Sequence, residues 1–257
     1  MKYLLTEICK QYGDHVVLRQ VTCAIPVVGL TVVMGPSGSG KSTLLRLLSF
    51  VESPDAGTVR LELDDTTFSS RGPERPWPRV TCVFQKLFLW PHLTILDNLR
   101  LPLAAAGRER IERRLSEVID LFGMGDFVRR YPNEVSGGQT QRAALARAFL
   151  LDPQLILIDE AHTGLDLEQQ TILNRYLLTL RSSGVGLIIV THSIDFARHY
   201  ADRIVIVEKS YVVEDDRDEI FARSPSSEYV RRAMEIFAPN ARNGSPQPGE
   251  LHREEKR

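Results

Sequence analysis

The chain has 257 residues, of which 43% are hydrophobic and 25% charged, and its formal net charge is −1. This length and composition are typical of one large globular domain, with or without an inserted subdomain, and such a core needs no disulfide or metal. The balanced charge argues against a broad nucleic-acid-binding face. The three cysteines, Cys9, Cys23 and Cys82, are far apart, which excludes a CxxC pair and predicts a reduced, cytosolic chain.

No segment is apolar for the roughly 20 residues that a membrane-spanning helix needs. The most apolar stretch, 21–34, is interrupted by Pro26 and Gly29, and no signal peptide is expected at the N-terminus. Any association with a membrane is therefore expected to run through a partner.

The first part of the chain changes from strand-like to helix-like patterns. Strands are expected at 2–9 and 16–25, and the wholly apolar, β-branched run at 30–34 is typical of a buried central strand. A glycine-rich turn at 35–40 follows, and leucines at helical spacing then predict a helix at 42–50. Strand, glycine turn and helix thus follow one another without a gap.

The middle of the chain is predicted to be mostly helical. An edge strand is expected at 58–63, a polar, proline-rich loop at 64–78 and a further strand at 79–85. Helical patterns then dominate 94–150.

Apolar strands return after residue 150, at 155–158, 187–191 and 204–207, with helices at about 167–181 and 194–200 between them. Strands that are apolar on both faces and alternate with helices predict an α/β fold with a mostly parallel sheet covered on both sides. We therefore expect one domain at 1–237, with its core at 1–90 and 151–237, a helical subdomain at about 91–150, and a disordered polar tail at 238–257.

The glycine-rich turn carries the clearest chemical signal. It fits the pattern GxxxxGK[ST] in full, with the residues Gly35, Pro36, Ser37, Gly38, Ser39, Gly40, Lys41, Ser42 and Thr43. Its glycines let backbone N–H groups converge on phosphate oxygens, and the following helix adds its positive N-terminal end. Lys41 is expected to contact the β- and γ-phosphates, and the Ser42 hydroxyl to ligate Mg²⁺.

Two acids end the apolar strand at 155–158. Carboxylates at the carboxyl end of a parallel strand lie where ligands bind in open α/β sheets. Asp159 is expected to hold Mg²⁺, directly or through water, and Glu160 to act on the water that attacks the γ-phosphate.

A third signal precedes the helix at 139–150. Ser136 can cap this helix, and Gly137, Gly138 and Gln139 follow it. Glycine costs about 1 kcal/mol in a helix, so two glycines favour a backbone that must approach a phosphate closely. The alternative is an ordinary capped helix.

Three single residues complete the predicted site. Gln85 and His192 each end a strand, which places them at the same edge of the sheet as the phosphate loop. Tyr12 is a candidate for stacking on adenine, with a turn aromatic that covers the edge of the core as the alternative.

In their order along the chain these motifs resemble an ATP-binding-cassette (ABC) ATPase, a P-loop NTPase with antiparallel edge strands beside a parallel core and an inserted helical subdomain. The match runs from about residue 4 to 235. The resemblance implies ATP and Mg²⁺ as cofactors, Glu160, His192 and Gln85 as catalytic residues, and Asp166 in the D-loop at 163–166. It implies Ser42, Gln85 and Asp159 as the Mg²⁺ ligands.

The same resemblance implies partners. Two subunits, either a homodimer or a pair with a second ABC ATPase, would hold each ATP between Lys41 of one subunit and Ser136, Gly137 and Gly138 of the other. Separate permease subunits would hold the pair at the cytoplasmic face of the cell membrane.

Within the family, stretches such as Pro91-His92-Leu93-Thr94 and Tyr131-Pro132 look like the ATPases of polar amino-acid importers, which use a solute-binding protein. The chain departs from them in Ala161 and His162, which replace the usual Pro-Thr, and in Ser193, which replaces Glu. The alternatives are an importer of another solute, an exporter, a lipid-handling system, or a non-transport ABC ATPase. No nucleic-acid partner is expected.

An apolar cluster, Phe88, Leu89 and Trp90, follows Gln85. A partner groove is a common reason for such a patch, and in the family that the chain resembles the cytoplasmic helix of the permease docks there. The alternative is that Phe88 and Trp90 pack inside the helical subdomain. Because only the polar tail follows residue 237, no small-molecule sensor domain is expected.

Overall fold

The computed structural model describes residues 1–27, 29–105, 111–160, 162, 164–209, 211–216, 228, 229 and 231. The predicted tail at 238–257 lies outside the described residues, as do Ala161 and Thr163.

An antiparallel sheet opens the chain. Its strand order is β2-β1-β4-β5, and every neighbouring pair is antiparallel. The strands are β1 (Lys2–Tyr12), β2 (His15–Pro26), β4 (Ala56–Leu63) and β5 (Thr66–Ser69). Two details differ from the prediction: β4 lies inside this sheet rather than at its edge, and β5 occupies part of the segment predicted as a loop. The reason is a tight turn at Asp64, which has a positive φ of 51° and folds β5 back onto β4.

The second sheet is the mostly parallel core that the sequence predicts. Its order is β10-β9-β3-β8-β7-β6, in which only the β10–β9 pair is antiparallel. The strands are β3 (Leu30–Met34), β6 (Val80–Val83), β7 (Leu155–Asp159), β8 (Gly186–Val190), β9 (Arg203–Glu208) and β10 (Tyr211–Asp216). Every residue of β3, β7 and β8 is buried, as expected for strands covered on both faces.

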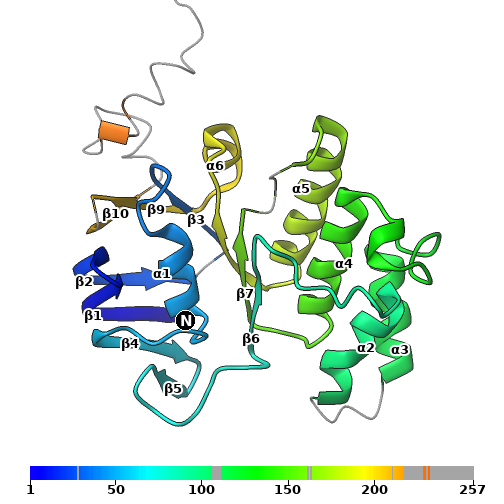
Figure 1. Ribbon diagram of the computed structural model, residues 1–257, viewed down its shortest axis with the longest axis horizontal. Coiled ribbons are helices and arrows are strands. Elements are labelled where there is room, and N and C mark those ends of the chain that lie inside the picture. Colours follow the sequence, from blue (N-terminus) through cyan, green and yellow to red (C-terminus); the bar gives the residue numbers. More distant parts are fainter. Residues whose placement is uncertain are drawn as a thin grey trace, which may run out of the picture.

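Helices cover both faces of this sheet. They are α1 (Lys41–Leu48), α2 (Ile95–Ala105), α3 (Ile111–Leu121), α4 (Gly137–Phe149), α5 (Leu167–Ser182) and α6 (Ile194–Tyr200), with a 3₁₀ turn at Pro132–Glu134. Figure 1 shows α1 and the antiparallel sheet on one side, and α4 and α5 on the other, with α2 and α3 outermost.

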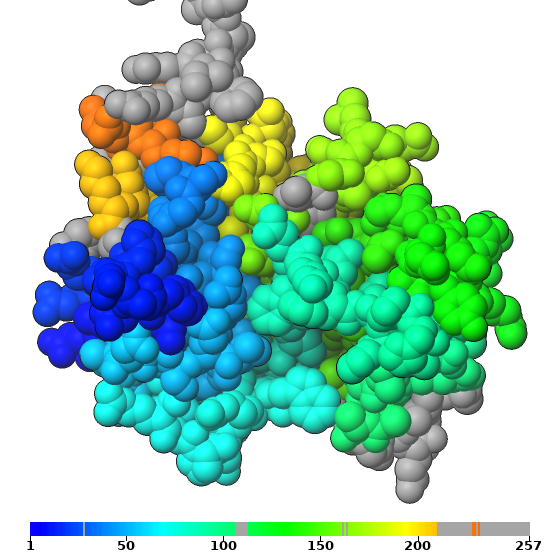
Figure 2. Space-filling model, viewed as in Figure 1, coloured from blue at the N-terminus to red at the C-terminus, as the bar shows by residue number. Residues whose placement is uncertain are grey.

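Alternating strand residues divide the core in two. Val33, Leu157 and Ile188 pack with α1 and the antiparallel sheet. Val32 and Ile158, which point to the opposite face of the same sheet, pack with α2 to α6. In the space-filling view, blue residues of the antiparallel sheet therefore lie on one side and green residues of the helical segment on the other (Figure 2). The carboxyl ends of β3, β6, β7 and β8 meet at the sheet edge between these two parts, because these strands are parallel.

Candidate active site

The phosphate loop connects β3 to α1. Gly35 has a φ of 147°, and a Cβ there would lie 2.0 Å from the Val207 carbonyl oxygen. Gly40 has a φ of 104° and begins α1 in the left-handed conformation. Only glycine tolerates both positions, so the backbone can curl around an anion at the start of a helix.

Two side chains of this loop are poised for an anion. The Lys41 ammonium donates to the carbonyl oxygens of Gly35 and Pro36, at 3.0 and 2.8 Å, and burial lowers its pKa despite the nearby acids Glu160 and Asp159. The Ser39 hydroxyl is buried, and among the residues that the structure describes it has no hydrogen-bond partner. Because buried polar atoms are nearly always paired, an oxygen-rich ligand is the natural partner for Ser39.

The donor set fits Mg²⁺. The Ser42 hydroxyl donates to Oδ1 of Asp159 at 3.2 Å, which brings two hard oxygen ligands together below the loop. Asp159 is only 4% exposed, and this burial raises the pKa of its carboxyl group, with a smaller contribution from Glu160. A divalent cation would compensate the buried charge.

Two segments that are distant in sequence converge on Glu160. Its Oε2 accepts from Nε2 of Gln85 at 2.8 Å, and its Oε1 lies 3.1 Å from Nε2 of His192. The backbone fixes this arrangement, because the Glu160 N–H donates to the Val190 carbonyl and so ties the end of β7 to β8. Ser193, one of the departures in the sequence, caps α6 and starts the helix directly after His192. The carboxylate is thus held at two points and 18% exposed.

A cleft of about 480 Å³ joins these parts. Its walls come from the phosphate loop and α1, from Glu160 and His192, and from Tyr12, which is 43% exposed. A triphosphate nucleotide therefore has a continuous path from the loop to the aromatic ring. Gln85 reaches this site through its bond to Glu160, two residues beyond the end of β6 rather than at the strand end.

The four residues Ser136, Gly137, Gly138 and Gln139, which we call the signature, lie elsewhere. Ser136 caps α4, with its hydroxyl accepting from the Gln139 N–H at 3.3 Å and its own N–H donating to the Gln139 side chain at 2.9 Å. A Cβ at Gly138 would lie 2.9 Å from the Gln169 side chain, so contact with α5 explains this glycine within the subunit. A Cβ at Gly137 would meet no other atom of the described part of the chain within 4 Å, which leaves this backbone open. The signature lines a separate hollow of about 40 Å³ beside Leu165 of the D-loop, and does not line the cleft of its own phosphate loop.

Asp166 caps α5 by accepting from the Gln169 N–H at 2.8 Å, and Leu167 beside it is 79% exposed. The signature and the D-loop therefore share one surface, on which an apolar residue is left bare.

The structure adds residues that the sequence analysis did not assign. His162 lies between Glu160 and Asp166; its Nε2 is 2.6 Å from Oδ1 of Asn174 on α5, and its ring packs on Phe196 of α6 at 4.8 Å. No sequence signal announces this contact beyond the unusual residue itself. Arg46 and Glu52, which contact Tyr12, were missed because single charged residues on a helix face and in a turn carry no motif.

The comparisons with known proteins agree with this geometry. A family model described as "ABC transporter" matches residues 18–163. The "Arginine transport ATP-binding protein ArtM" of Bacillus subtilis (strain 168) is 34% identical over 232 residues, which are 89% of this chain and 97% of that protein. The "Glycine betaine transport ATP-binding protein OpuAA" of the same organism is 37% identical over 234 residues, 89% of this chain and 56% of that protein.

A solved structure agrees as well. The "Dimeric structure of a post-hydrolysis state of the ATP-binding cassette MJ0796 bound to ADP and Pi" matches with a TM-score of 0.73 at 30% identity, covering 84% of this chain and 98% of that one. Among the described residues, no helix is long and apolar enough to cross a membrane. The family match and the converging phosphate loop, acids and cassette fold lead to one conclusion: the chain belongs to the ABC transporter family, as an ATP-binding and ATP-hydrolysing subunit.

Proposed function

We propose that the cleft binds ATP through residues 35–43 and Tyr12 and that Glu160 is the general base for its hydrolysis. The observation that carries this assignment is the position of Glu160, which lies in the wall of the phosphate-loop cleft and is held by Gln85 and His192. A carboxylate that is fixed at two points is already oriented, so it can position and deprotonate a water molecule without first ordering its own side chain. His192 contacts one oxygen of the carboxylate. Gln85 contacts the other oxygen and connects the site along the chain to the helical segment that follows.

The Mg²⁺ assignment rests on the oxygen pair of Ser42 and Asp159. The cation would neutralise charge on the phosphates. Gln85 is the third proposed ligand, and its Oε1 would hold the cation, since its Nε2 donates to Glu160.

Two subunits are proposed to complete the site. The open backbone at Gly137 and the capped start of α4 form a surface for phosphate, but this surface does not line the subunit's own cleft. A head-to-tail pair brings the signature of one subunit over Lys41 of the other and buries Leu167 beside Asp166. Dimeric cassettes among the structural neighbours support this arrangement.

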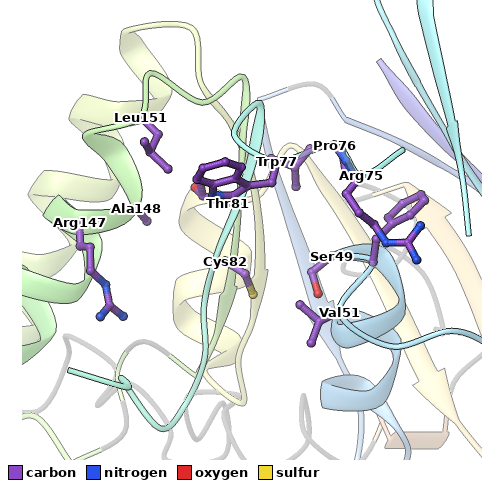
Figure 3. Close-up of a pocket in the computed structure, with 12 residues that line it drawn as sticks. Ser49, Val51, Arg75, Pro76, Trp77, Thr81, Cys82, Arg147, Ala148 and Leu151 are labelled. Atoms are coloured by element: carbon purple, nitrogen blue, oxygen red, sulfur yellow. The ribbon is translucent and has the colours of Figure 1, made fainter. Parts of the chain in front are cut away.

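A second groove is proposed as the docking site of a membrane permease. It has a volume of about 330 Å³ and is lined on one side by Ser49 and Val51, after α1, and on the other by Arg147, Ala148 and Leu151 (Figure 3). Trp77 lies between the two walls and is 47% exposed, and Val51 is 64% exposed. Apolar side chains left bare in a groove favour a protein partner.

The apolar cluster after Gln85 adjoins this groove. The Arg147 guanidinium donates to the carbonyl oxygens of Leu87 and Phe88, at 2.7 and 2.8 Å, and so links the groove wall to the cluster. Phe88 and Trp90 are 57% and 54% exposed, so the alternative that they pack inside the helical segment is wrong, although Leu89 does pack against the core. A permease helix in this groove would be placed to sense Gln85, and it would hold the subunit at the cytoplasmic face of the membrane.

The solute is proposed to be a polar amino acid. The arginine relative, of which this chain spans 97%, supports this class, as do the sequence stretches quoted above. The glycine betaine relative, at 37% identity, makes that zwitterion the second candidate.

Uptake into proteoliposomes tests the proposal. The chain would be reconstituted with the permease and binding protein that co-purify with it, and ATP-driven uptake of labelled arginine, glutamine and glycine betaine would be compared. We expect uptake of one of the two amino acids, absent in the Lys41→Ala variant. Uptake of glycine betaine alone would show that betaine, and not an amino acid, is the solute. A chain that co-purifies with nucleic acid instead of a permease would overturn the transport assignment.

A further inference from the structure

Tyr12 is exposed, yet its hydroxyl is held in a closed network. The hydroxyl donates to Oε2 of Glu52 and accepts from Nη1 of Arg46 at 3.2 Å. The same Arg46 nitrogen donates to Oε1 of Glu52 at 3.1 Å. These three residues, which we call the tyrosine clamp, come from the end of β1, from α1 and from the turn after α1, and together they fix the direction of the ring.

Lys10 supports the ring. Its ammonium lies 5.4 Å from the Tyr12 ring centroid, in the range of a cation–π contact. Lys10 is held in turn by the Ser53 carbonyl at 3.0 Å and the Asp55 carboxylate at 3.3 Å. Lys10 and Asp55 line a hollow of about 460 Å³ on the antiparallel sheet, whereas Tyr12 and Arg46 line the phosphate-loop cleft. Lys10 lines the first of these hollows and is not among the residues that line the cleft, whereas Tyr12 lines the cleft.

The contribution of these ion pairs to folding stability does not explain why so many charged groups surround Tyr12. Arg46, Glu52 and Asp55 keep 36%, 27% and 45% of their side-chain surface exposed, and ion pairs at such positions contribute little to folding. What the network does achieve is to immobilise an exposed aromatic ring at the rim of the cleft. A ring that is already fixed loses no rotational freedom when a ligand stacks on it, and binding is correspondingly tighter.

We propose that Glu52 and Arg46 are positioning residues that hold the Tyr12 ring as a stacking platform for the base of the bound nucleotide, with Lys10 in cation–π contact with the ring. This inference rests on the proposed function of the cleft as an ATP site. It assigns a specific role to two residues outside the phosphate loop. It also predicts little choice between bases, because every base has a face on which an aromatic ring can stack.

The test compares Glu52→Ala, Glu52→Gln and Tyr12→Phe in the full chain. Glu52→Ala removes both carboxylate oxygens from the clamp, and with them the one hydrogen bond that the Tyr12 hydroxyl donates. We therefore expect Kd and KM for ATP to rise about 3- to 10-fold, as for one lost hydrogen bond, with kcat unchanged. The affinity for GTP is expected to fall by the same factor. Glu52→Gln keeps one acceptor and is expected to fall between wild type and Glu52→Ala. Glu62→Ala is the matched control, because it removes an exposed ion pair with Lys2 on the same sheet.

The double variant Tyr12→Phe/Glu52→Ala tests whether Glu52 acts through the Tyr12 hydroxyl. Tyr12→Phe keeps the ring but removes the hydroxyl, so adding Glu52→Ala to it is expected to change Kd no further. Additive losses, or a Glu52→Ala protein that binds ATP like wild type, would overturn the clamp. Lys41→Ala, measured in parallel, separates this outcome from a failure of the proposed function: if Lys41→Ala also leaves ATP binding unchanged, the cleft itself is not the nucleotide site.

Discussion

Replacing Glu160 by Gln tests the centre of the proposed mechanism. The substitution keeps the size of the side chain but exchanges one acceptor oxygen for an NH₂ group. Since both oxygens of Glu160 face donors, Gln85 Nε2 at 2.8 Å and His192 Nε2 at 3.1 Å, the amide can satisfy only one of them as they stand. The side chain is 18% exposed, so water can solvate the other, and we expect only a small change in thermal stability.

The effect on turnover is expected to be much larger. An amide cannot take a proton from water, and a positioned general base contributes about 10²- to 10⁴-fold, which is about 2.7 to 5.4 kcal/mol of barrier. Phosphate release under single-turnover conditions measures the loss, and equilibrium binding measures ATP affinity, which we expect to be retained. Light scattering is expected to detect an ATP-dependent dimer that does not decay.

The control is Glu117→Gln, an exposed carboxylate on α3 that pairs with Arg113. It should hydrolyse ATP like wild type. A folded Glu160→Gln protein that also hydrolyses ATP at the wild-type rate would refute the reasoning, because some other group would then have to activate the water.

Three further predictions use other parts of the site. Lys41→Ala is expected to weaken ATP binding and abolish hydrolysis, and unchanged affinity in a direct binding assay would contradict the phosphate-loop assignment. Asp159→Asn is expected to stop hydrolysis while raising the Tm of the nucleotide-free protein: burial raises the Asp159 pKa above its unfolded value, so the ionised carboxylate destabilises the fold at neutral pH. This gain in Tm should shrink as the pH falls through the raised pKa and the carboxyl group takes up its proton; a gain independent of pH would show another cause. Trp90→Ala is expected to reduce permease-coupled transport about tenfold or more while the Tm and ATPase activity of the isolated subunit stay near wild type, because the side chain is 54% exposed and interface aromatics dominate binding. Equal losses of both activities, with a lower Tm, would show that Trp90 stabilises the subunit itself rather than a contact with the permease.

Features that depend only on neighbouring residues can be predicted from the amino-acid sequence. The glycines at 35, 38 and 40, followed directly by Lys41 and Ser42, predict the phosphate loop because only glycine tolerates the backbone angles found there. The apolar runs at 30–34 and 155–158 predict buried parallel strands, since a strand covered on both faces has no polar side. The position of Asp159 at the end of such a strand then predicts a ligand site.

Tertiary structure decided which of these features meet. Gln85 and His192 are 75 and 32 residues from Glu160, and it is the order of β6, β7 and β8 in the sheet that brings them to one carboxylate. Contacts over such separations depend on how strands pair, and no local pattern encodes pairing. The exposure of Phe88 and Trp90 also depends on tertiary packing, since a buried and an exposed apolar cluster have the same sequence pattern.

The tyrosine clamp is the clearest case. A tyrosine in a turn, an arginine on a helix and a glutamate after that helix each have ordinary local explanations. They become a unit only because β1 pairs with β4 in the antiparallel sheet and α1 packs between the two sheets, which brings residues 34 and 40 positions apart within hydrogen-bond distance of one hydroxyl. Local chemistry therefore specified the phosphate loop, whereas long-range packing specified what surrounds it.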